Sequence, residues 1–249
     1  LFQLSNDFHV RKVMRNYLPN DEESKHFACL LQWDNIYYQE PTEEYISPKT
    51  TVRVGLVQWQ MRSYKTLDDL FEQVEFFVDS VSGYQSDFVL FPEYFNAPLM
   101  ARFNDASESQ AIRGLARYTD EIRERFINLA IRYNINIITG SMPLIKEDGL
   151  LYNVGFLCRR DGTYEMYEKL HVTPDEMKCW GLSGGKAIRT FETDCAKIGV
   201  LICYDVEFPE LSRIMASEGM QILFVPFLTD TQNAYSRVRV CAHARAIEN

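Results

Sequence analysis

From residue 51 onwards, short apolar runs alternate with segments of helical periodicity, and this alternation restricts the chain to few folds. The runs at 52–58 and 87–91 are largely apolar without strict alternation, which is typical of strands buried on both faces. Between them, apolar residues recur every three or four positions from Leu67 to Val81, as on one face of a helix. Because such strands need helices to cover them, the pattern predicts an α/β sandwich in which helices cover the sheets.

The same alternation continues to the end of the chain. We expect helices at 114–133, from 208 and from about 234, and strands at 135–141, 150–158, 163–168, 188–191, 197–202 and 221–226. The sequence Arg-Asp-Gly at 160–162 has the composition of a hairpin turn. Loops at the carboxyl ends of strands in such folds are where ligands collect.

Cys203 directly follows the apolar run 197–202, and Phe-Pro-Glu at 208–210 then opens a helix. At a strand-to-helix elbow the side chain projects from the strand end, while the next backbone N–H groups lack partners. One piece of geometry can therefore supply a nucleophile and an oxyanion pocket. Taken alone, a structural thiol buried in an apolar strand would be the commoner interpretation.

Two further strands are followed by a reactive residue, Glu93 after 88–92 and Lys169 after 164–168. Either residue alone would usually be a solvated loop residue. A thiol, a carboxylate and an ammonium at one edge of the fold would together provide a nucleophile, a base and an oxyanion stabiliser. The combination favours a catalytic site over three unrelated residues.

Composition narrows the class of substrate. The net charge is −9 and no Lys/Arg cluster occurs, which argues against a nucleic-acid or membrane partner and favours small or polar neutral substrates. Six cysteines without a Cys-x-x-Cys pair and four histidines without ligand spacing argue against a metal site. We find no signal peptide and no apolar run long enough to cross a bilayer, so we expect a cytoplasmic protein with free thiols.

Three separate segments carry recognisable motifs. They are Phe-Pro-Glu-Tyr-Phe at 91–95, Glu-Lys-Leu-His-Val-Thr-Pro-Asp-Glu at 168–176 and Cys-Tyr-Asp-Val-Glu-Phe-Pro-Glu at 203–210. In this order, and with the ending at 244–249, they resemble the signature segments of the nitrilase (carbon-nitrogen hydrolase) superfamily. The resemblance covers about 52–249. It implies a four-layer α-β-β-α sandwich, hydrolysis of a non-peptide C–N bond of a small amide through a cysteine thioester, no cofactor, and a homodimer or higher homo-oligomer.

The resemblance also implies roles by position. Cys203 would be the nucleophile, Glu93 the general base, Lys169 the oxyanion stabiliser, and Glu176 a second carboxylate that orients the site. The chemistry agrees, because a free thiol titrates near about 8.5 and needs a neighbouring base or cation to attack at neutral pH. The backbone N–H of Tyr204 would be the second oxyanion donor. Candidates for shaping the substrate pocket are Tyr94, Tyr204, Phe227 and Thr229.

Neighbouring polar residues admit structural interpretations. We expect His171 to brace its loop or bind a backbone carbonyl, in preference to forming a Cys-His dyad. Asp205 and Glu207 are expected to cap the following helix. Many relatives carry Arg where Glu207 stands, which puts a carboxylate-binding role for that position in doubt. The glycine-containing stretch 181–186 differs from a phosphate loop, because its first glycine is misplaced and no Ser or Thr follows Lys186. We expect it to form a turn.

The N-terminal part differs from the rest of the chain. Strand-like runs at 8–14 and 26–31 resemble the last two strands of a GNAT-type acetyltransferase domain, without its glycine-rich acetyl-CoA loop. We therefore expect a partial acetyltransferase-like domain at 1–40, a linker at 41–51 and a nitrilase-like domain at 52–249. Leu1 is not an initiator Met and the chain stops in an apparently helical segment, which leaves open an excerpt truncated at its C-terminus.

Two other functions stay open at this point. The chain could be an acyltransferase that passes the thioester to an amine instead of water. It could also be a non-catalytic binding protein that keeps the sandwich without turnover, although Glu93, Lys169 and Cys203 are all intact.

Overall fold

The structure, a computed structural model, describes residues 8–15, 25, 27–33, 51–103 and 105–249. It divides into two compact units, Leu1–Ser47 and Pro48–Asn249. In the first unit, β1 (Phe8–Arg15) pairs antiparallel with β2 (Phe27–Trp33), with a shift of register between Val10 and Lys12. These strands match the expected runs, except that residue 26 and nearly all of the expected linker lie outside the described residues.

The second unit contains a seven-stranded mixed sheet. Its strands are β3 (Val54–Leu56), β4 (Phe88–Leu90), β5 (Asn136–Ile138), β7 (Leu151–Cys158) and β6 (Met142–Ile145) in spatial order, with β8 (Tyr164–Glu168) and β9 (Leu182–Ser183) also paired to β7. β4 runs parallel to β5, β7 runs antiparallel to β5, and β8 runs antiparallel to β7. β4 and β8 therefore point the same way, and their carboxyl ends lie toward the same edge of the sheet.

A second sheet has three strands, β10 (Thr190–Glu192), β11 (Lys197–Val200) and β12 (Ile222–Phe224). β11 is the central strand, antiparallel to β10 and parallel to β12. The expected strands at 188–191, 197–202 and 221–226 all occur in shorter form. β11 ends at Val200, and two buried residues, Leu201 and Ile202, connect it to the turn that begins at Cys203.

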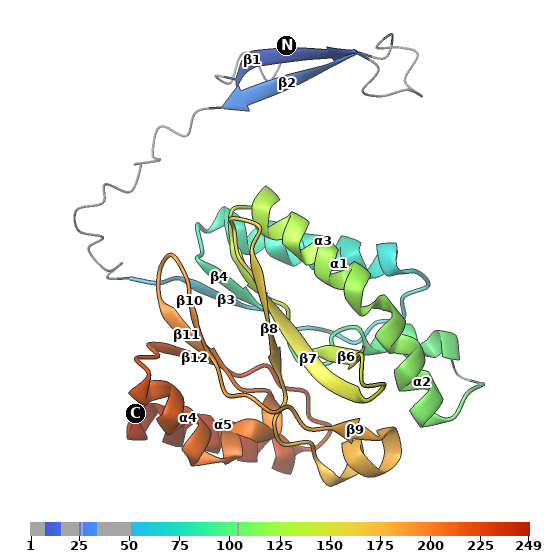
Figure 1. The fold of residues 1–249 in the computed structure, drawn as a ribbon, viewed down its shortest axis with the longest axis vertical. Helices are drawn as coiled ribbons and strands as arrows, with labels where there is room; N and C mark the ends of the chain where they lie inside the picture. The colour runs from blue at the N-terminus through green and yellow to red at the C-terminus, as the bar shows by residue number, and fades with distance from the viewer. Residues whose placement is uncertain (1–7, 16–24, 26, 34–50, 104) are drawn as a thin grey trace. The chain divides into compact units, whose positions relative to one another are not determined.

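Helices cover the outer faces of the two sheets. They are α1 (Leu67–Gly83), α2 (Glu108–Leu115), α3 (Thr119–Arg132), α4 (Pro209–Ser217) and α5 (Gln232–Glu248). In Figure 1, α1 and α3 lie on one side of the sheets and α4 and α5 on the other. The second unit is thus the expected α/β, four-layer α-β-β-α sandwich.

The single helix expected at 114–133 is instead two helices joined by a 3-10 turn at Ala116–Tyr118. A capping box formed by Ser107 and Gln110 starts the first of them earlier than periodicity alone suggested. Several elements were not anticipated. They are strand β6, which contains Pro143, a 3-10 helix at Ala97–Phe103, a π-helical turn at Glu176–Trp180, and the short strand β9 within the stretch 181–186 that was expected to be a turn.

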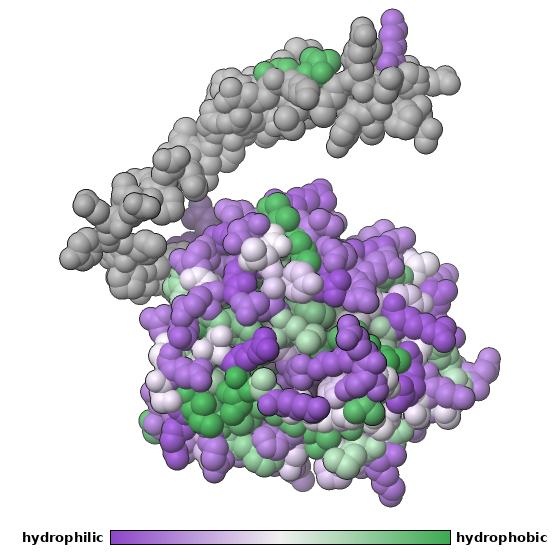
Figure 2. All heavy atoms as spheres, viewed as in Figure 1, coloured by the Kyte–Doolittle hydropathy of each residue, from purple (hydrophilic) through white to green (hydrophobic). Residues whose placement is uncertain are grey.

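The core follows these layers. On β4, Val89 packs with α1 and α3 side chains, whereas Phe88 faces the second sheet, where its ring lies 5.3 Å from that of Phe224. Both faces of the strand are therefore buried, as its apolar run indicated. Hydrophilic side chains dominate the face of the second unit in Figure 2, because the apolar residues lie between the layers. Among the described residues, no helix combines the length and apolarity needed to cross a membrane.

Candidate active site

Glu93 lies just beyond the carboxyl end of β4. The chain there is held by a parallel bridge to Ser141, the residue that precedes β6. The Glu93 side chain is only 2% exposed. Its Oε1 accepts hydrogen bonds from Lys169 Nζ and from Asn153 Nδ2, each at 2.9 Å, and its Oε2 accepts one from the Leu228 backbone N–H at 3.1 Å. Three donors from separate segments therefore fix both carboxylate oxygens.

Lys169 directly follows β8 and is as buried as Glu93, at 2% exposure. Its ammonium lies between two carboxylates, 2.9 Å from Glu93 Oε1 and 2.7 Å from Glu176 Oε1. Burial by itself lowers the pKa of this lysine, but the charges of Glu93 and Glu176 outweigh burial and raise the pKa above its ordinary value. The ammonium therefore stays charged at neutral pH.

Glu176 is the first residue of a π-helical turn, Glu176–Trp180. Its Oε1 also accepts a hydrogen bond from the Tyr94 hydroxyl at 3.2 Å, and its Oε2 accepts one from Thr173 N at 2.7 Å. Tyr94 itself has a φ of 51°, in the left-handed region. Burial, followed by the charges of Glu176 and Glu93, raises the pKa of its hydroxyl well above the ordinary value, so this hydroxyl remains a donor.

Cys203 occupies the elbow after β11, with a φ of 48°. A left-handed conformation for a non-glycine residue costs on the order of 1–3 kcal/mol and is found at functional turns. Its N–H donates to Pro226 O at 2.9 Å, and its Sγ lies 3.9 Å from Leu228 O. The residue is 8% exposed. The segment 226–228 therefore contacts both Cys203 and Glu93.

The pKa directions at this site indicate how a proton would move. Burial and the negative charge of Glu93 raise the pKa of the Cys203 thiol, and Lys169 opposes them. Burial also raises the pKa of Glu93, while Lys169 lowers it. The resting cysteine is therefore a thiol, and it could act as a nucleophile only if a neighbouring group took its proton. Glu93 is the carboxylate that exerts the largest charge effect on it.

The turn after Cys203 presents a backbone donor. Cys203–Glu207 forms a 3-10 helix and α4 begins at Pro209, as the Phe-Pro-Glu pattern predicted. Because Tyr204 is at the start of this turn, helix geometry provides no intrahelical acceptor for its N–H. The Tyr204 ring packs edge-on against Phe208, with centroids 5.1 Å apart.

The capping roles expected for Asp205 and Glu207 are wrong. Phe208 is the N-cap residue of α4, and no side-chain capping hydrogen bond forms there. Asp205 instead accepts the backbone N–H groups of Leu170 at 3.0 Å and His171 at 2.7 Å. Glu207 pairs with Arg237 of α5 at 2.6 Å. Both carboxylates find partners in distant segments, which the local spacing could not reveal.

His171 braces its loop, but through a carboxylate and a ring rather than a backbone carbonyl. Its Nδ1 lies 3.0 Å from Asp205 Oδ1. Its imidazole also stacks on Phe208, with centroids 3.7 Å apart and an interplanar angle of 11°. The contacts found for its ring are with Asp205 and Phe208, so the structure gives no support for a Cys-His dyad.

Two of the pocket candidates lie on the segment after β12. The ring of Phe227 packs 6.1 Å from that of Tyr235 on α5. Thr229 follows Leu228, whose N–H holds Glu93, and is half-buried. Phe227 therefore lies within the segment that contacts Cys203 and Glu93, and Thr229 directly follows it.

Sequence reasoning missed two groups that hold Glu93. One is Asn153, a fully buried polar residue within the apolar strand β7. A polar residue in a run that is expected to be buried could have marked this position as part of the site. The other group is the backbone N–H of Leu228, which no sequence pattern could indicate. Among the described residues, no group of three or more His, Cys, Asp or Glu side chains is arranged to hold a metal ion.

Comparison with known proteins places this chain in a family. The carbon-nitrogen hydrolase family model matches residues 53–249. The chain is 44% identical over 249 residues to a probable hydrolase, YhcX, of Bacillus subtilis, covering all of this chain and 48% of the relative. It is 30% identical over 211 residues to human omega-amidase NIT2, covering 80% of this chain and 72% of the relative.

A solved carbon-nitrogen hydrolase from Helicobacter pylori superposes with a TM-score of 0.68 at 21% identity, covering 80% of this chain and 70% of that one. The chain therefore belongs to the carbon-nitrogen hydrolase family, whose relatives here include hydrolases and amidases. It spans about half the length of the Bacillus subtilis relative.

Proposed function

We propose that the chain is an amidase that hydrolyses the C–N bond of a small amide through a thioester on Cys203. The observation that carries the proposal is the buried Lys169 ammonium, held 2.9 Å from Glu93 and 2.7 Å from Glu176. The charges of all three groups act on Cys203, which begins the turn that follows β11. Family membership and the similarity to an omega-amidase support the reaction class.

In the first half-reaction, Glu93 accepts the thiol proton while Cys203 Sγ attacks the amide carbon. The carbonyl oxygen becomes an oxyanion, stabilised by Lys169 Nζ and the Tyr204 N–H. Glu93 then returns its proton to the nitrogen, the C–N bond breaks, and the amine leaves an acyl group on sulfur. The raised pKa of Glu93 suits both transfers, because the carboxyl can hold a proton between them.

In the second half-reaction, Glu93 removes a proton from a water that attacks the thioester carbon. The same donors stabilise the second tetrahedral oxyanion, the C–S bond breaks, and the thiol regains its proton as the carboxylic acid leaves. Glu176 orients Lys169 through its 2.7 Å contact and does not exchange a proton in this scheme. We propose that Tyr94, Tyr204, Phe227 and Thr229 shape the substrate pocket around the elbow.

The proposal is tested by ammonia release from a panel of small primary amides. We expect turnover by the parent and none by Cys203→Ala. The control is Cys195→Ala, which removes a half-buried thiol that does not contact the cluster of Glu93, Lys169 and Glu176, and this variant should turn over amide like the parent. Turnover by Cys203→Ala at the parental rate would refute the cysteine mechanism. Product formed only when an amine acceptor is present would identify an acyltransferase in place of a hydrolase.

We also infer that β1 and β2 derive from an acetyltransferase-like domain, to which we assign no activity. Their antiparallel pairing is compatible with that origin. We further propose a cytoplasmic homodimer or higher homo-oligomer, which multi-angle light scattering of the purified chain would test. A monomeric mass at assay concentrations would rule out the oligomer.

A further inference from the structure

A buried carboxylate near the cluster plays no chemical part in the proposed reaction. The Asp205 side chain is 1% exposed. It accepts hydrogen bonds from Leu170 N at 3.0 Å and His171 N at 2.7 Å, and its Oδ1 lies 3.0 Å from His171 Nδ1. Because burying a charge without partners is costly, three such contacts show a carboxylate tied to one segment of chain.

The segment that Asp205 holds begins immediately after Lys169, and Asp205 itself is two residues beyond Cys203. These hydrogen bonds therefore join the loop that supplies the ammonium to the turn that supplies the thiol. The stack of His171 on Phe208 makes a second connection between the same two segments. Phe208 in turn packs against Tyr204, whose N–H is the other proposed oxyanion donor.

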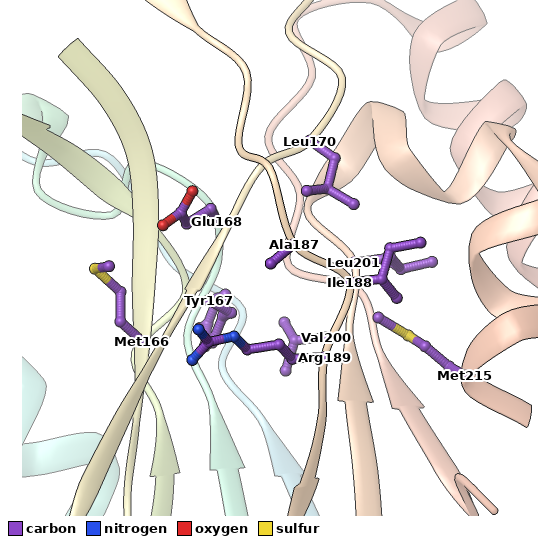
Figure 3. A pocket seen from close by; sticks show the side chains of 10 residues that line it. All are labelled: Met166, Tyr167, Glu168, Leu170, Ala187, Ile188, Arg189, Val200, Leu201 and Met215. Carbon is purple, nitrogen blue, oxygen red and sulfur yellow. The ribbon is translucent and has the colours of Figure 1, made fainter. Parts of the chain in front are cut away.

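Leu170 packs against the buried residues Leu201, Leu211 and Met215, but this packing is incomplete. Leu170 lines a cavity of about 60 Å³, together with Ile188, Leu201 and Met215. Figure 3 shows the Leu170 side chain at this cavity, between the segments that lead from β8 and β11. A side chain beside empty space has fewer contacts that resist displacement. The backbone of Lys169 itself is held by hydrogen bonds from its N–H to Asn153 O at 2.9 Å and from Gly185 N to its carbonyl oxygen at 2.8 Å. The hydrogen bonds to Asp205 are the directional restraints that tie the next two residues to the turn that carries Cys203.

We propose that Asp205 and His171 are positioning residues that fix the spacing between the two oxyanion donors, Lys169 Nζ and Tyr204 N–H. This inference rests on the proposed function, because only an oxyanion requires both donors at once. Donors stabilise such an oxygen when they lie about 2.7–3.1 Å from it, and a displacement of about 1 Å can cost roughly 100-fold in rate.

The test uses Asp205→Asn, which keeps the side-chain shape but presents an NH₂ group to one of the two backbone N–H donors. His171→Phe keeps a ring over Phe208 and removes only the contact with Asp205. Asp194→Asn is the matched control, an exposed aspartate that precedes the amino end of β11. For each variant, kcat and KM for an amide are measured with the rate at which iodoacetamide alkylates Cys203, followed on the Cys203 peptide.

Alkylation discriminates because it is a substitution at a saturated carbon, in which iodide leaves and no oxyanion forms. We expect Asp205→Asn to lower kcat about 100-fold while KM and the alkylation rate stay within about threefold. His171→Phe should lower kcat about tenfold or less, since Asp205 keeps both backbone donors. Asp194→Asn should match the parent in all three measurements.

Two results would overturn the inference. One is a parental kcat in Asp205→Asn, and the other is an equal fall in turnover and alkylation, which would indicate general damage to the site. Neither bears on the amidase proposal, which fails separately if Cys203→Ala turns over amide. Thermal unfolding of each variant confirms that the compared proteins are folded.

Discussion

At the scale of single residues, the central feature is one ammonium shared by two buried carboxylates. Glu93 lies 76 positions before Lys169 and 83 before Glu176, yet Lys169 Nζ is within hydrogen-bond distance of both carboxylates. A buried ion pair contributes little net stability, but removing one member leaves its partners charged and uncompensated. The cluster therefore makes the site sensitive to any loss of charge.

Replacing Lys169 by Met should destabilise the fold as well as abolish turnover. We expect a loss of about 3–5 kcal/mol in the free energy of unfolding, measured by urea denaturation, because two adjacent carboxylates remain buried. Lys197→Met is the control, since its partner Glu192 is 75% exposed and the pair should contribute at most about 1 kcal/mol. Equal effects of the two substitutions would contradict this account of the cluster.

Glu93→Gln should lower kcat by about 10²–10⁴-fold, because a general base is lost while the side-chain volume is kept. The parent should lose kcat/KM as the pH falls, since a protonated Glu93 cannot accept the thiol proton. Burial raises the pKa of Glu93, so this decline should occur above the ordinary glutamate value of about 4.3. A pH–rate profile measures it, and an unchanged acid limb in Glu93→Gln would assign the decline to another group.

Sequence reasoning at this scale succeeded where strand ends carried unusual residues. Glu93, Lys169 and Cys203 were singled out because each follows a predicted strand, whereas Glu176 was assigned from the family resemblance. The structure places Lys169 between Glu93 and Glu176. Asp205 was misassigned because its partners, Leu170 and His171, lie 35 and 34 positions away. Local spacing predicts a cap, whereas the tertiary fold decides which buried donors a carboxylate reaches.

At the scale of elements, β7 is the strand on which the site depends. It carries Asn153, pairs with β8 before Lys169, and contains Gly155, where the surroundings leave no room for a side chain. A Cβ atom there would lie 2.1 Å from Gly140 O and 2.3 Å from the Tyr167 ring. The backbone oxygen can give way only if the sheet itself moves.

Gly155→Ala should therefore destabilise the protein by about 1–3 kcal/mol, measured by chemical denaturation. Gly83→Ala is the matched control at the end of α1, where an added Cβ meets nothing within 4 Å. That substitution should be neutral or stabilising by about 0.4–1 kcal/mol. A Gly155→Ala variant as stable as Gly83→Ala would show that the strands tolerate closer packing than the structure indicates.

The elements themselves were largely predictable, because each apolar run or helical face became a strand or helix. The exceptions have local causes. Gly140, with a φ of 70°, turns the chain after β5, so the expected strand at 135–141 is shorter and β6 follows it. Pro143 made β6 hard to recognise, since proline usually argues against a strand.

At the scale of the whole molecule, alternation of strands and helices predicted the layers but not the pairing. Nothing in the runs 163–168 and 197–202 indicated that one joins the seven-stranded sheet and the other the three-stranded sheet. The change of sequence character near residue 41 did indicate a separate N-terminal part, and the structure divides the chain between Ser47 and Pro48, within the expected linker. All residues placed at the candidate site lie in the second unit.

Removing residues 1–47 should accordingly leave the kinetic constants for an amide within about threefold of those of the full chain, because the site lies entirely in Pro48–Asn249. Steady-state assays of the two proteins measure this. A folded but inactive shorter chain would show that the first unit contributes to the reaction.

The most direct test of the central claim is the intact mass of the protein after brief incubation with small amides and quenching in acid. We predict a mass increase equal to the substrate minus its amine, located on the Cys203 peptide, absent in Cys203→Ala and present in Cys195→Ala. Turnover without any Cys203 adduct, or an acyl group on another residue, would contradict it.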